Sequence, residues 1–370
     1  MIVLVVLVAA AATLWAVRAL RPEPTARLSV GIGMESLADT NFDDVARHFD
    51  AAGVSEFSLA IGRGEWVAFP WEGHDEYWSG IATQADETGT DPVDAAVSAL
   101  REAPGGWQRD VTLTIDALAP ATISEDSDYA GEFSDGEQSD SIPSAYALEE
   151  GQVGEDIVAL CGETANRYEP TRIALTEVFG DAFFSAKDEE LYSEMTGNDG
   201  FPRTAEDDID TRDASLHQWQ SDIITGLIDR CGDAAGVPVE IDSRVNWDDL
   251  GEDNTDNGNL YGELLDHAGR VSLWAYMGLN DAEPGSTKQL VQRLRERFGE
   301  EELNRFTISV GLWASGDDHG SDAEDATYSA EDMRTAVDKA AAGPGLVAVT
   351  PLSKMTQEHW DALAEADAAR

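Results

Sequence analysis

The chain has 370 residues, and 42% of them are hydrophobic, a composition typical of a folded globular protein. Its 73 acidic residues far outnumber its 24 basic residues, and the formal net charge is −49. Such a charge repels nucleic-acid phosphates, anionic membranes and strongly acidic polysaccharides, so it disfavours these classes of partner.

The N-terminal segment is an apolar run over residues 2–17, interrupted only by Thr13 and followed by Arg18 and Arg21. Its length lies between a signal-peptide core and a minimal spanning helix, so we predict that residues 1–21 are a signal peptide or a hydrophobic helix acting as a membrane anchor. We expect the remaining chain to be extracellular or cell-surface, tethered or secreted. The alternative is a cytoplasmic-facing anchor, because both arginines follow the run.

Eight strand signals alternate with eight helix signals, with no linker between them. The strands are predicted at Arg27–Met34, Glu56–Ile61, Asp110–Asp116, Ile173–Leu175, Val237–Ile241, Arg270–Tyr276, Arg305–Leu312 and Gly345–Val349. The helices are predicted at Phe42–Ala52, Pro92–Arg101, Glu155–Tyr168, Leu216–Ala234, Leu260–His267, Thr287–Phe298, Ala330–Ala342 and Glu358–Ala368. This order predicts an α/β fold, a single (β/α)₈ TIM barrel over residues 27–368. We expect a monomer.

One stretch interrupts this order. Residues 124–144 are rich in Ser, Asp, Glu and Gly, and we predict an acidic excursion that is too polar to pack and is mobile.

Alternation within the strands predicts which side chains line the barrel. Successive side chains of a strand point to opposite faces, so large aliphatic residues should pack on the helices while the intervening small or polar ones point inward. Extending this rule places acidic and aromatic residues at the mouth, where barrel enzymes carry their active sites. The predicted mouth comprises Glu35, Asp116, Glu177, Asp242, Arg244, Trp274, Tyr276 and Trp313. On strand four, Glu177 is in phase with the aliphatic residues, so a bulge at Thr176 is needed to turn it inward.

Cys161 and Cys231 are the only cysteines, and they lie on consecutive predicted helices. Two interpretations are open: a helix-to-helix disulfide, which fits an extracellular location, or two buried free thiols. Two cysteines are too few for a structural zinc site, and no histidine lies beside either one.

The acidic residues are spread over every predicted loop and helix surface, and only four residues are lysines. This distribution indicates adaptation to high salt, and the alternative is a surface protein loaded with calcium. We find no GxSxG, HExxH, phosphate-cradling or dinucleotide motif, and we expect neither a metal site nor a cofactor.

Several carboxylates around one cavity, with aromatic rings beside them, suit the binding and cleavage of glycosidic bonds. Trp66 also falls just after a predicted strand and can offer a stacking surface to a sugar. Taken singly, each such residue is more often structural than functional. Their clustering on one face favours a saccharide site.

The order of motifs resembles the glycoside-hydrolase-like TIM barrels, which include the C-terminal hydrolase domain of the poly-N-acetylglucosamine export deacetylases. Four segments between Leu28 and Leu352 carry the resemblance: Phe69-Pro70, Ile115-Asp116, Pro143–Tyr168 and Thr176–Phe184. The family has an acidic residue at the end of strand four; Glu177 matches it here, and Asp181 is the alternative match. The chain departs from the pattern of many retaining barrel glycosidases at the end of strand seven, where Trp313 replaces a glutamate.

From these observations we predict a glycoside hydrolase that acts on a neutral or amino-sugar polysaccharide. Glu177 is expected to be the general acid, with Asp116 or Asp242 as the partner carboxylate. Arg244 is expected to keep Asp242 ionised, and Asp181 to contribute to substrate binding. The alternative is a cell-surface barrel that binds glycans without cleaving them.

Overall fold

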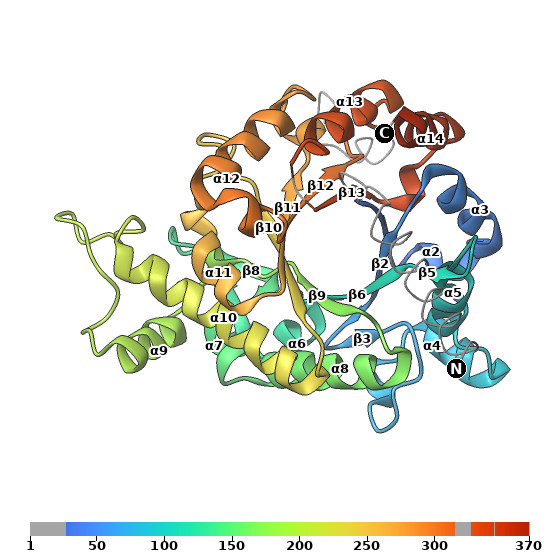
Figure 1. Ribbon diagram of the computed structural model, residues 1–370. Helices are drawn as coiled ribbons and strands as arrows, with labels where there is room; N and C mark the ends of the chain where they lie inside the picture. Colours follow the sequence, from blue (N-terminus) through green and yellow to red (C-terminus); the bar gives the residue numbers. More distant parts are fainter. Residues whose placement is uncertain (1–26, 315–326, 344, 370) are drawn as a thin grey trace, which may run out of the picture.

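The computed structural model describes residues 27–314, 327–343 and 345–369. These residues form a closed barrel of eight parallel strands with helices around it (Figure 1). The strand order follows the chain order, and β1 closes the barrel by pairing in parallel with both β2 and β13. The predicted (β/α)₈ fold is therefore confirmed.

The barrel strands are β1 (Arg27–Ile32), β2 (Glu56–Arg63), β6 (Asp110–Asp116), β9 (Arg172–Thr176), β10 (Val239–Arg244), β11 (Arg270–Ala275), β12 (Phe306–Gly311) and β13 (Leu346–Thr350). The main helices that follow them are α3 (Phe42–Ala52), α5 (Pro92–Arg101), α8 (Gln152–Tyr168), α10 (Ala214–Ala235), α11 (Tyr261–His267), α12 (Ser286–Leu303), α13 (Ala330–Ala340) and α14 (Gln357–Ala369).

The hydrophobic core lies between the strands and this ring of helices. On β6 the side chains of Val111, Leu113 and Ile115 are buried, and all three belong to that core. Phe49 of α3 is buried against it from the helix side. The aliphatic half of each alternating strand therefore faces outward to the helices, as predicted, and burying it provides the main driving force for the fold.

Several helices begin and end at residues that satisfy their free backbone groups. Asp91 accepts hydrogen bonds from the amides of Val93 and Asp94 at the start of α5, and Pro92 occupies its first turn. Gly236 ends α10 in the left-handed conformation that glycine adopts without steric penalty. These local signals explain why the helix boundaries were close to those predicted from the sequence.

Shorter elements decorate the loops between the barrel strands. They are α2 (Ser36–Asp39), β3 (Trp66–Val67), α4 (Gly80–Thr88), β4 (Glu102–Ala103), β5 (Trp107–Gln108), α6 (Pro120–Glu125), β7 (Ala130–Glu132), β8 (Gln138–Pro143), α7 (Ala145–Glu149) and α9 (Ala186–Thr196). Single 3₁₀ turns lie at Asp75–Tyr77, Ser127–Tyr129, Gly180–Ala182, Thr255–Asn257, Met277–Leu279 and Leu352–Lys354.

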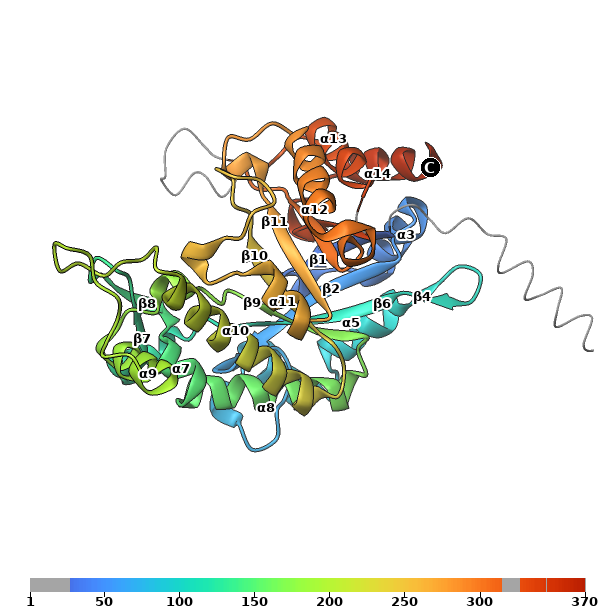
Figure 2. The same cartoon turned by 60° about the vertical axis from the view of Figure 1, so that its left-hand side comes forward.

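The acidic excursion is folded, so the prediction that residues 124–144 do not pack was wrong. They contain the antiparallel hairpin β7–β8, which lies near α7 and α9 on one side of the molecule (Figure 2). Ala130 is buried, and the amide of Phe184 donates a hydrogen bond to the carbonyl of Glu132. Cross-strand pairing satisfies the backbone even though most side chains of the segment are polar.

Helices α8 and α10 are joined by a disulfide between Cys161 and Cys231, whose Cα atoms are 5.5 Å apart. Of the two interpretations of the cysteines, the structure contains the disulfide. The predicted N-terminal hydrophobic helix lies outside the described residues. Within the described part of the chain, no helix is both long and apolar enough to cross a membrane.

Candidate active site

A cavity of about 560 Å³ opens among the loops at the C-terminal ends of the strands and continues into the barrel. Six of the residues predicted for the mouth line it: Glu35, Glu177, Asp242, Trp274, Tyr276 and Trp313. They lie on five different strands or in the turns directly after them, which only the closure of the barrel brings together. The C-terminal face is where barrel enzymes carry their catalytic groups.

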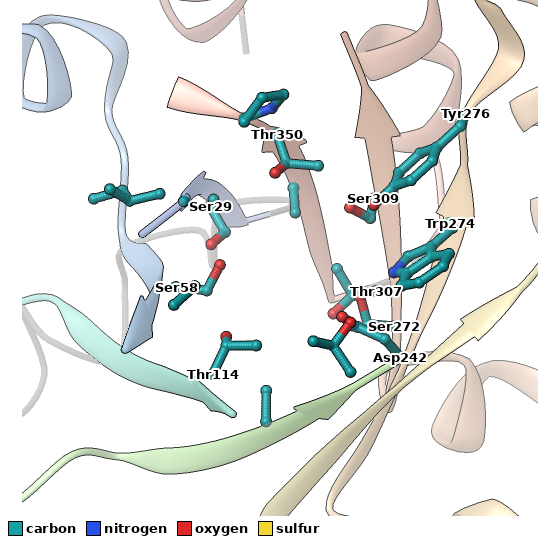
Figure 3. A pocket seen from close by; sticks show the side chains of 18 of the residues that line it. Ser29, Ser58, Thr114, Asp242, Ser272, Trp274, Tyr276, Thr307, Ser309 and Thr350 are labelled. Atoms are coloured by element: carbon teal, nitrogen blue, oxygen red, sulfur yellow. The ribbon is translucent and has the colours of Figure 1, made fainter. Parts of the chain in front are cut away.

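The inner wall of the cavity is made of small and polar side chains, as the alternation predicted. Ser29 on β1, Thr114 on β6 and Ser309 on β12 all line it, and Figure 3 shows their hydroxyl groups around one space. The same period places Ser58 and Ser272 on the inner faces of β2 and β11. Barrel interiors are usually filled by bulky branched residues, so these small side chains leave the space open.

Glu177 reaches the cavity through its backbone conformation. Strand β9 ends at Thr176, and Glu177 has φ +61°, in the left-handed region that residues other than glycine seldom adopt. This turn reverses the phase of the strand, so that Glu177 lines the cavity although Ile173 and Leu175 are buried on the outer face. The predicted bulge at Thr176 was wrong, because Thr176 pairs with Asp116 in continuous register.

The surroundings of Glu177 favour its protonated form. Burial raises the pKa of Glu177 to about 7, and the negative charges of Asp116 and Asp242 act in the same direction. The guanidinium groups of Arg244 and Arg63 oppose this rise in pKa without cancelling it. A carboxyl group with such a pKa can hold a proton near neutral pH and release it to a substrate.

Asp116 lies beside Glu177 but outside the set of residues that line the cavity. Arg63 donates a hydrogen bond of 3.0 Å to its carboxylate, and the amide of Leu118 donates another of 2.7 Å. Burial raises the pKa of Asp116, and both of these partners oppose the rise. A register shift between Ala60 and Gly62 of β2 places Arg63 opposite Asp116.

Asp242 points into the cavity from the middle of β10. Burial raises the pKa of Asp242 to about 6, and hydrogen bonds from Thr176, Ser272 and Trp274 act in the opposite direction. The prediction that Arg244 keeps Asp242 ionised was wrong. The guanidinium of Arg244 instead contacts Asp181, with 3.4 Å between Nη1 and Oδ2.

Arg244 and Asp181 form a second layer beside the cavity. The guanidinium carbon of Arg244 lies 3.9 Å from the centre of the Phe179 ring, a cation–π contact that fixes the side chain. The carboxylate of Asp181 uses one oxygen for Arg244, while its buried Oδ1 has no hydrogen-bond partner among the described residues. Arg244 influences Glu177 electrostatically, and Asp181 does not line the cavity.

One wall of the cavity is aromatic. The rings of Trp274 and Tyr276 lie next to each other on this wall (Figure 3). They are stacked, with centroids 5.4 Å apart and planes inclined by 9°. Trp313 continues the wall, with its ring 4.9 Å from that of Tyr276. Trp66 lies elsewhere: it lines a neighbouring cavity of about 490 Å³, which shares Glu35 with the first.

Several further residues of this site were not predicted from the sequence. Thr350, Ser353 and Lys354 line the cavity from the end of β13 and the following turn, and the hydroxyl of Ser353 donates a hydrogen bond of 2.8 Å to Glu35. Extending the period-two rule beyond Val349 would have found Thr350. Arg63 had no detectable signal, because the shift in β2 changes its phase.

Residues 27–314, 327–343 and 345–369 contain no group of three His, Cys, Asp or Glu side chains placed to hold a metal ion. The carboxylates and hydroxyls around the cavity are suited instead to proton transfer and to hydrogen bonding of a polyhydroxylated ligand.

No family model and no curated protein sequence matches this chain. Solved structures do share its fold. The PgaB (BpsB) glycoside hydrolase domain from Bordetella bronchiseptica superimposes with a TM-score of 0.62 at 14% identity, over 92% of this chain and 98% of that one. Two β-galactosidases also superimpose over 92% of this chain: the enzyme of Marinomonas ef1 (TM-score 0.63, 11% identity, 59% of its own length) and that of the haloarchaeon Halorubrum lacusprofundi (0.61, 12%, 57%). At these identities the likeness establishes the shared barrel fold.

Proposed function

We propose that this protein is a glycoside hydrolase that cleaves a neutral or amino-sugar polysaccharide or oligosaccharide. The observation that carries the proposal is Glu177, which is turned into the mouth of the cavity by a strained backbone and is surrounded by two further carboxylates. Strained residues concentrate at functional sites, because the surrounding structure must maintain a conformation that costs free energy. The glycoside hydrolases among the structural neighbours support the same reaction class.

The two carboxyl groups in the cavity differ in the way that glycoside hydrolysis requires. Glu177, with the higher pKa, would protonate the glycosidic oxygen of the leaving group. Asp242, whose pKa is lower, would be ionised and would either attack the anomeric carbon or activate water. Asp116 is the alternative partner, although its carboxylate is already engaged by Arg63 and the Leu118 amide.

The surfaces beside these carboxyl groups suit a sugar. A pyranose ring has an apolar face that stacks on aromatic side chains and hydroxyl groups that need hydrogen-bond partners. Trp274 and Trp313 would provide the stacking surface, and Glu35 would bind hydroxyls at the mouth. The negative charge of this site disfavours anionic sugars.

The test is hydrolysis of chitosan, chitin and neutral glucans by the purified protein in molar salt, with the release of reducing ends as the readout. We expect the Glu177→Gln variant to lose about 100-fold or more in rate while still binding the substrate, because a general acid contributes about 10²–10⁴-fold. Glu263→Gln, on the exposed surface of α11, is the matched control and should retain full activity. Equal rates for Glu177→Gln and the wild type would remove Glu177 from the catalytic role.

The second candidate function is glycan binding without cleavage. It predicts that wild type and Glu177→Gln bind the same oligosaccharides with similar affinity and that neither releases reducing ends. An aryl glycoside with a good leaving group separates the two functions further, because its cleavage needs no general acid. A hydrolase whose Glu177 has been replaced should still cleave it.

We further propose that the barrel acts outside the membrane as a monomer, tethered or released through residues 1–21, and that its acidic surface adapts it to high salt. The apolar N-terminal run and the charge of −49 support this. Protease added to intact cells should degrade the barrel, whereas a barrel on a cytoplasmic-facing anchor would be protected until the cells are lysed.

A further inference from the structure

The cavity is deeper than a catalytic cleft at the mouth requires. Its lining continues from Trp313, among the loops, to Glu56 and Glu240, inside the barrel. On β10, Glu240 precedes Asp242 by two residues on the same face, so it lies about 6.6 Å further down the strand. The open space therefore extends at least one layer of side chains below the carboxylates at the mouth.

The lower end of the cavity is blocked by a cluster of buried ion pairs. Arg270 contacts Glu56 at 2.6 Å and Glu240 at 3.2 Å, and Arg172 contacts Glu56 at 2.9 Å. Glu56 is 2% exposed and Arg270 is 5% exposed. A ligand can therefore approach this space only from the mouth, and a polymer can enter only by one of its ends.

The wall between the floor and the mouth carries hydroxyl groups that can form hydrogen bonds with a ligand. The Oγ1 atom of Thr307, a residue that is 1% exposed, lines the cavity and has no hydrogen-bond partner in the described part of the chain. The hydroxyls of Ser29, Ser58 and Thr114 line the same space (Figure 3). An apolar ligand would leave the buried hydroxyl of Thr307 unpaired and would remove water from the other hydroxyls, so it would be unfavourable here, whereas a polyhydroxylated ligand would be favourable.

The opposite side of this space is the stacked pair of Trp274 and Tyr276. Ser29, Ser58 and Thr114 lie across the cavity from this aromatic pair, whereas Thr307 lies on the same side as Trp274 (Figure 3). Hydroxyls on one side and an aromatic face on the other match the two faces of a single pyranose. The carboxylate of Asp242 disfavours a uronic or sialic acid in this position.

We propose that the cavity is a pit that receives the non-reducing end of a sugar chain and that the enzyme removes one terminal neutral or amino-sugar residue at a time. This inference rests on the proposed hydrolase function for its chemistry. Asp242 lies in the wall of the pit, so the anomeric carbon that it serves belongs to the residue inside, and the leaving oxygen points outward to Glu177. The rest of the chain would lie over the neighbouring cavity beside Trp66.

The reaction balances as a hydrolysis. The bond between the anomeric carbon of the terminal residue and the glycosidic oxygen breaks. Glu177 gives its proton to that oxygen, and the oxygen of a water molecule becomes bonded to the anomeric carbon. The proton that this water loses returns through the carboxylates to Glu177, so the products are a free monosaccharide and a chain shorter by one residue.

The experiment uses hexasaccharides of N-acetylglucosamine, glucosamine and glucose that carry a fluorescent label at the reducing end. We expect the first products in molar salt to be an unlabelled monosaccharide and a labelled pentamer. The same hexamers with a bulky 4,6-O-benzylidene group on the terminal residue should not be cleaved. If labelled dimers, trimers and tetramers are the first products, the proposal of a pit is refuted, whereas the proposed hydrolase function is not.

Two variants connect the result to the cavity. Ala60→Leu places a larger side chain in the wall of the pit, away from the carboxylates, and should abolish binding of the chain end. Thr307→Val keeps the shape but removes the unpaired hydroxyl and should weaken binding about fivefold, the usual effect of one neutral hydrogen bond. Ala95→Leu, on the exposed surface of α5, is the matched control, and thermal melts of all three establish that they fold.

Saturation-transfer NMR with the unlabelled hexamers tests the pit independently of cleavage. We expect the strongest transfer to the non-reducing terminal residue, and we expect this signal to be lost in Ala60→Leu and kept in Ala95→Leu. This result supports the proposed pit even if no hexamer is hydrolysed. In that case only the proposed hydrolase function is refuted. Uniform transfer along the sugar chain, or no transfer to any of the three hexamers, would refute the proposal of a pit.

Discussion

The buried ion cluster at the floor of the cavity allows a sharp test of how charge stabilises this barrel. Glu56 on β2 bonds to arginines from two distant strands, with 2.6 Å to Arg270 on β11 and 2.9 Å to Arg172 on β9. Among the residues that the structure describes, Glu240 forms an ion pair with Arg270 alone, at 3.2 Å. The variants Glu56→Gln and Glu240→Gln therefore make the same chemical change in the same cluster, but Glu56→Gln affects both of these arginines and Glu240→Gln affects one.

The fold favours different protonation states of the two glutamates. Burial opposes ionisation of Glu56, but the charges of Arg270, Arg172 and Arg27 outweigh it and lower its pKa. Burial raises the pKa of Glu240 well above its usual range despite Arg270, and the negative charge of Glu56 adds to the rise. The arginines therefore favour the ionised form of Glu56, whereas burial favours the protonated form of Glu240, which resembles glutamine.

We expect Glu56→Gln to lower the free energy of unfolding by about 3–5 kcal/mol at pH 6, because it leaves the buried guanidinium of Arg270 without its main partner. Glu240→Gln should cost about 1 kcal/mol or less, because its amide oxygen can still accept from Arg270. Urea unfolding in molar NaCl, followed by circular dichroism, measures both values. Urea is preferred because guanidinium would compete for the carboxylates.

The dependence on pH provides a second measurement. The lowered pKa of Glu56 stabilises the fold above the unfolded pKa of about 4.3, and this contribution is lost as the pH falls through the folded pKa. The raised pKa of Glu240 makes stability depend on pH in the opposite direction. Its contribution to stability is present at acid pH and is lost as the pH rises through the folded pKa. Glu240→Gln should therefore gain stability relative to the wild type above pH 7. Equal costs for the two variants at pH 6, or a cost of Glu56→Gln that grows on acidification, would refute this reasoning.

Three further outcomes follow from the structure. Activity should peak between the pKa values of Asp242 and Glu177, about 6 and about 7. Because Arg244 lowers the pKa of Glu177, Arg244→Met should move the alkaline limb of the pH–rate profile to higher pH. An alkaline limb that does not move would contradict the assignment of Glu177 as the general acid. Reduction of the Cys161–Cys231 disulfide, which spans 70 residues, should lower the free energy of unfolding by about 4 kcal/mol in urea, and a Cys161→Ala/Cys231→Ala variant should not respond to the reductant. The melting temperature should rise with KCl from 0.05 to 2 M, because screening relieves the repulsion of a net charge of −49, and a flat or falling series would direct attention to bound calcium.

The sequence alone determined the barrel and the face on which its site lies. Strand and helix periods are local properties, repeated here eight times, and they assigned Val111, Leu113 and Ile115 to the helix side of β6. The same rule predicted that Trp274 and Tyr276 face the inside of the barrel, and both line the cavity. These predictions hold because the direction of a side chain within a regular strand depends only on its position in that strand.

Tertiary structure decided the features that break this regularity. The left-handed turn at Glu177, the shift in β2 that sets Arg63 opposite Asp116, and the hairpin within residues 124–144 all depend on contacts with segments far along the chain. Partner choice is equally non-local: Arg244 is two residues from Asp242, yet it bonds to Asp181, which lies 63 residues away. A guanidinium takes the carboxylate that the fold presents with the best geometry, and the sequence does not encode that geometry locally.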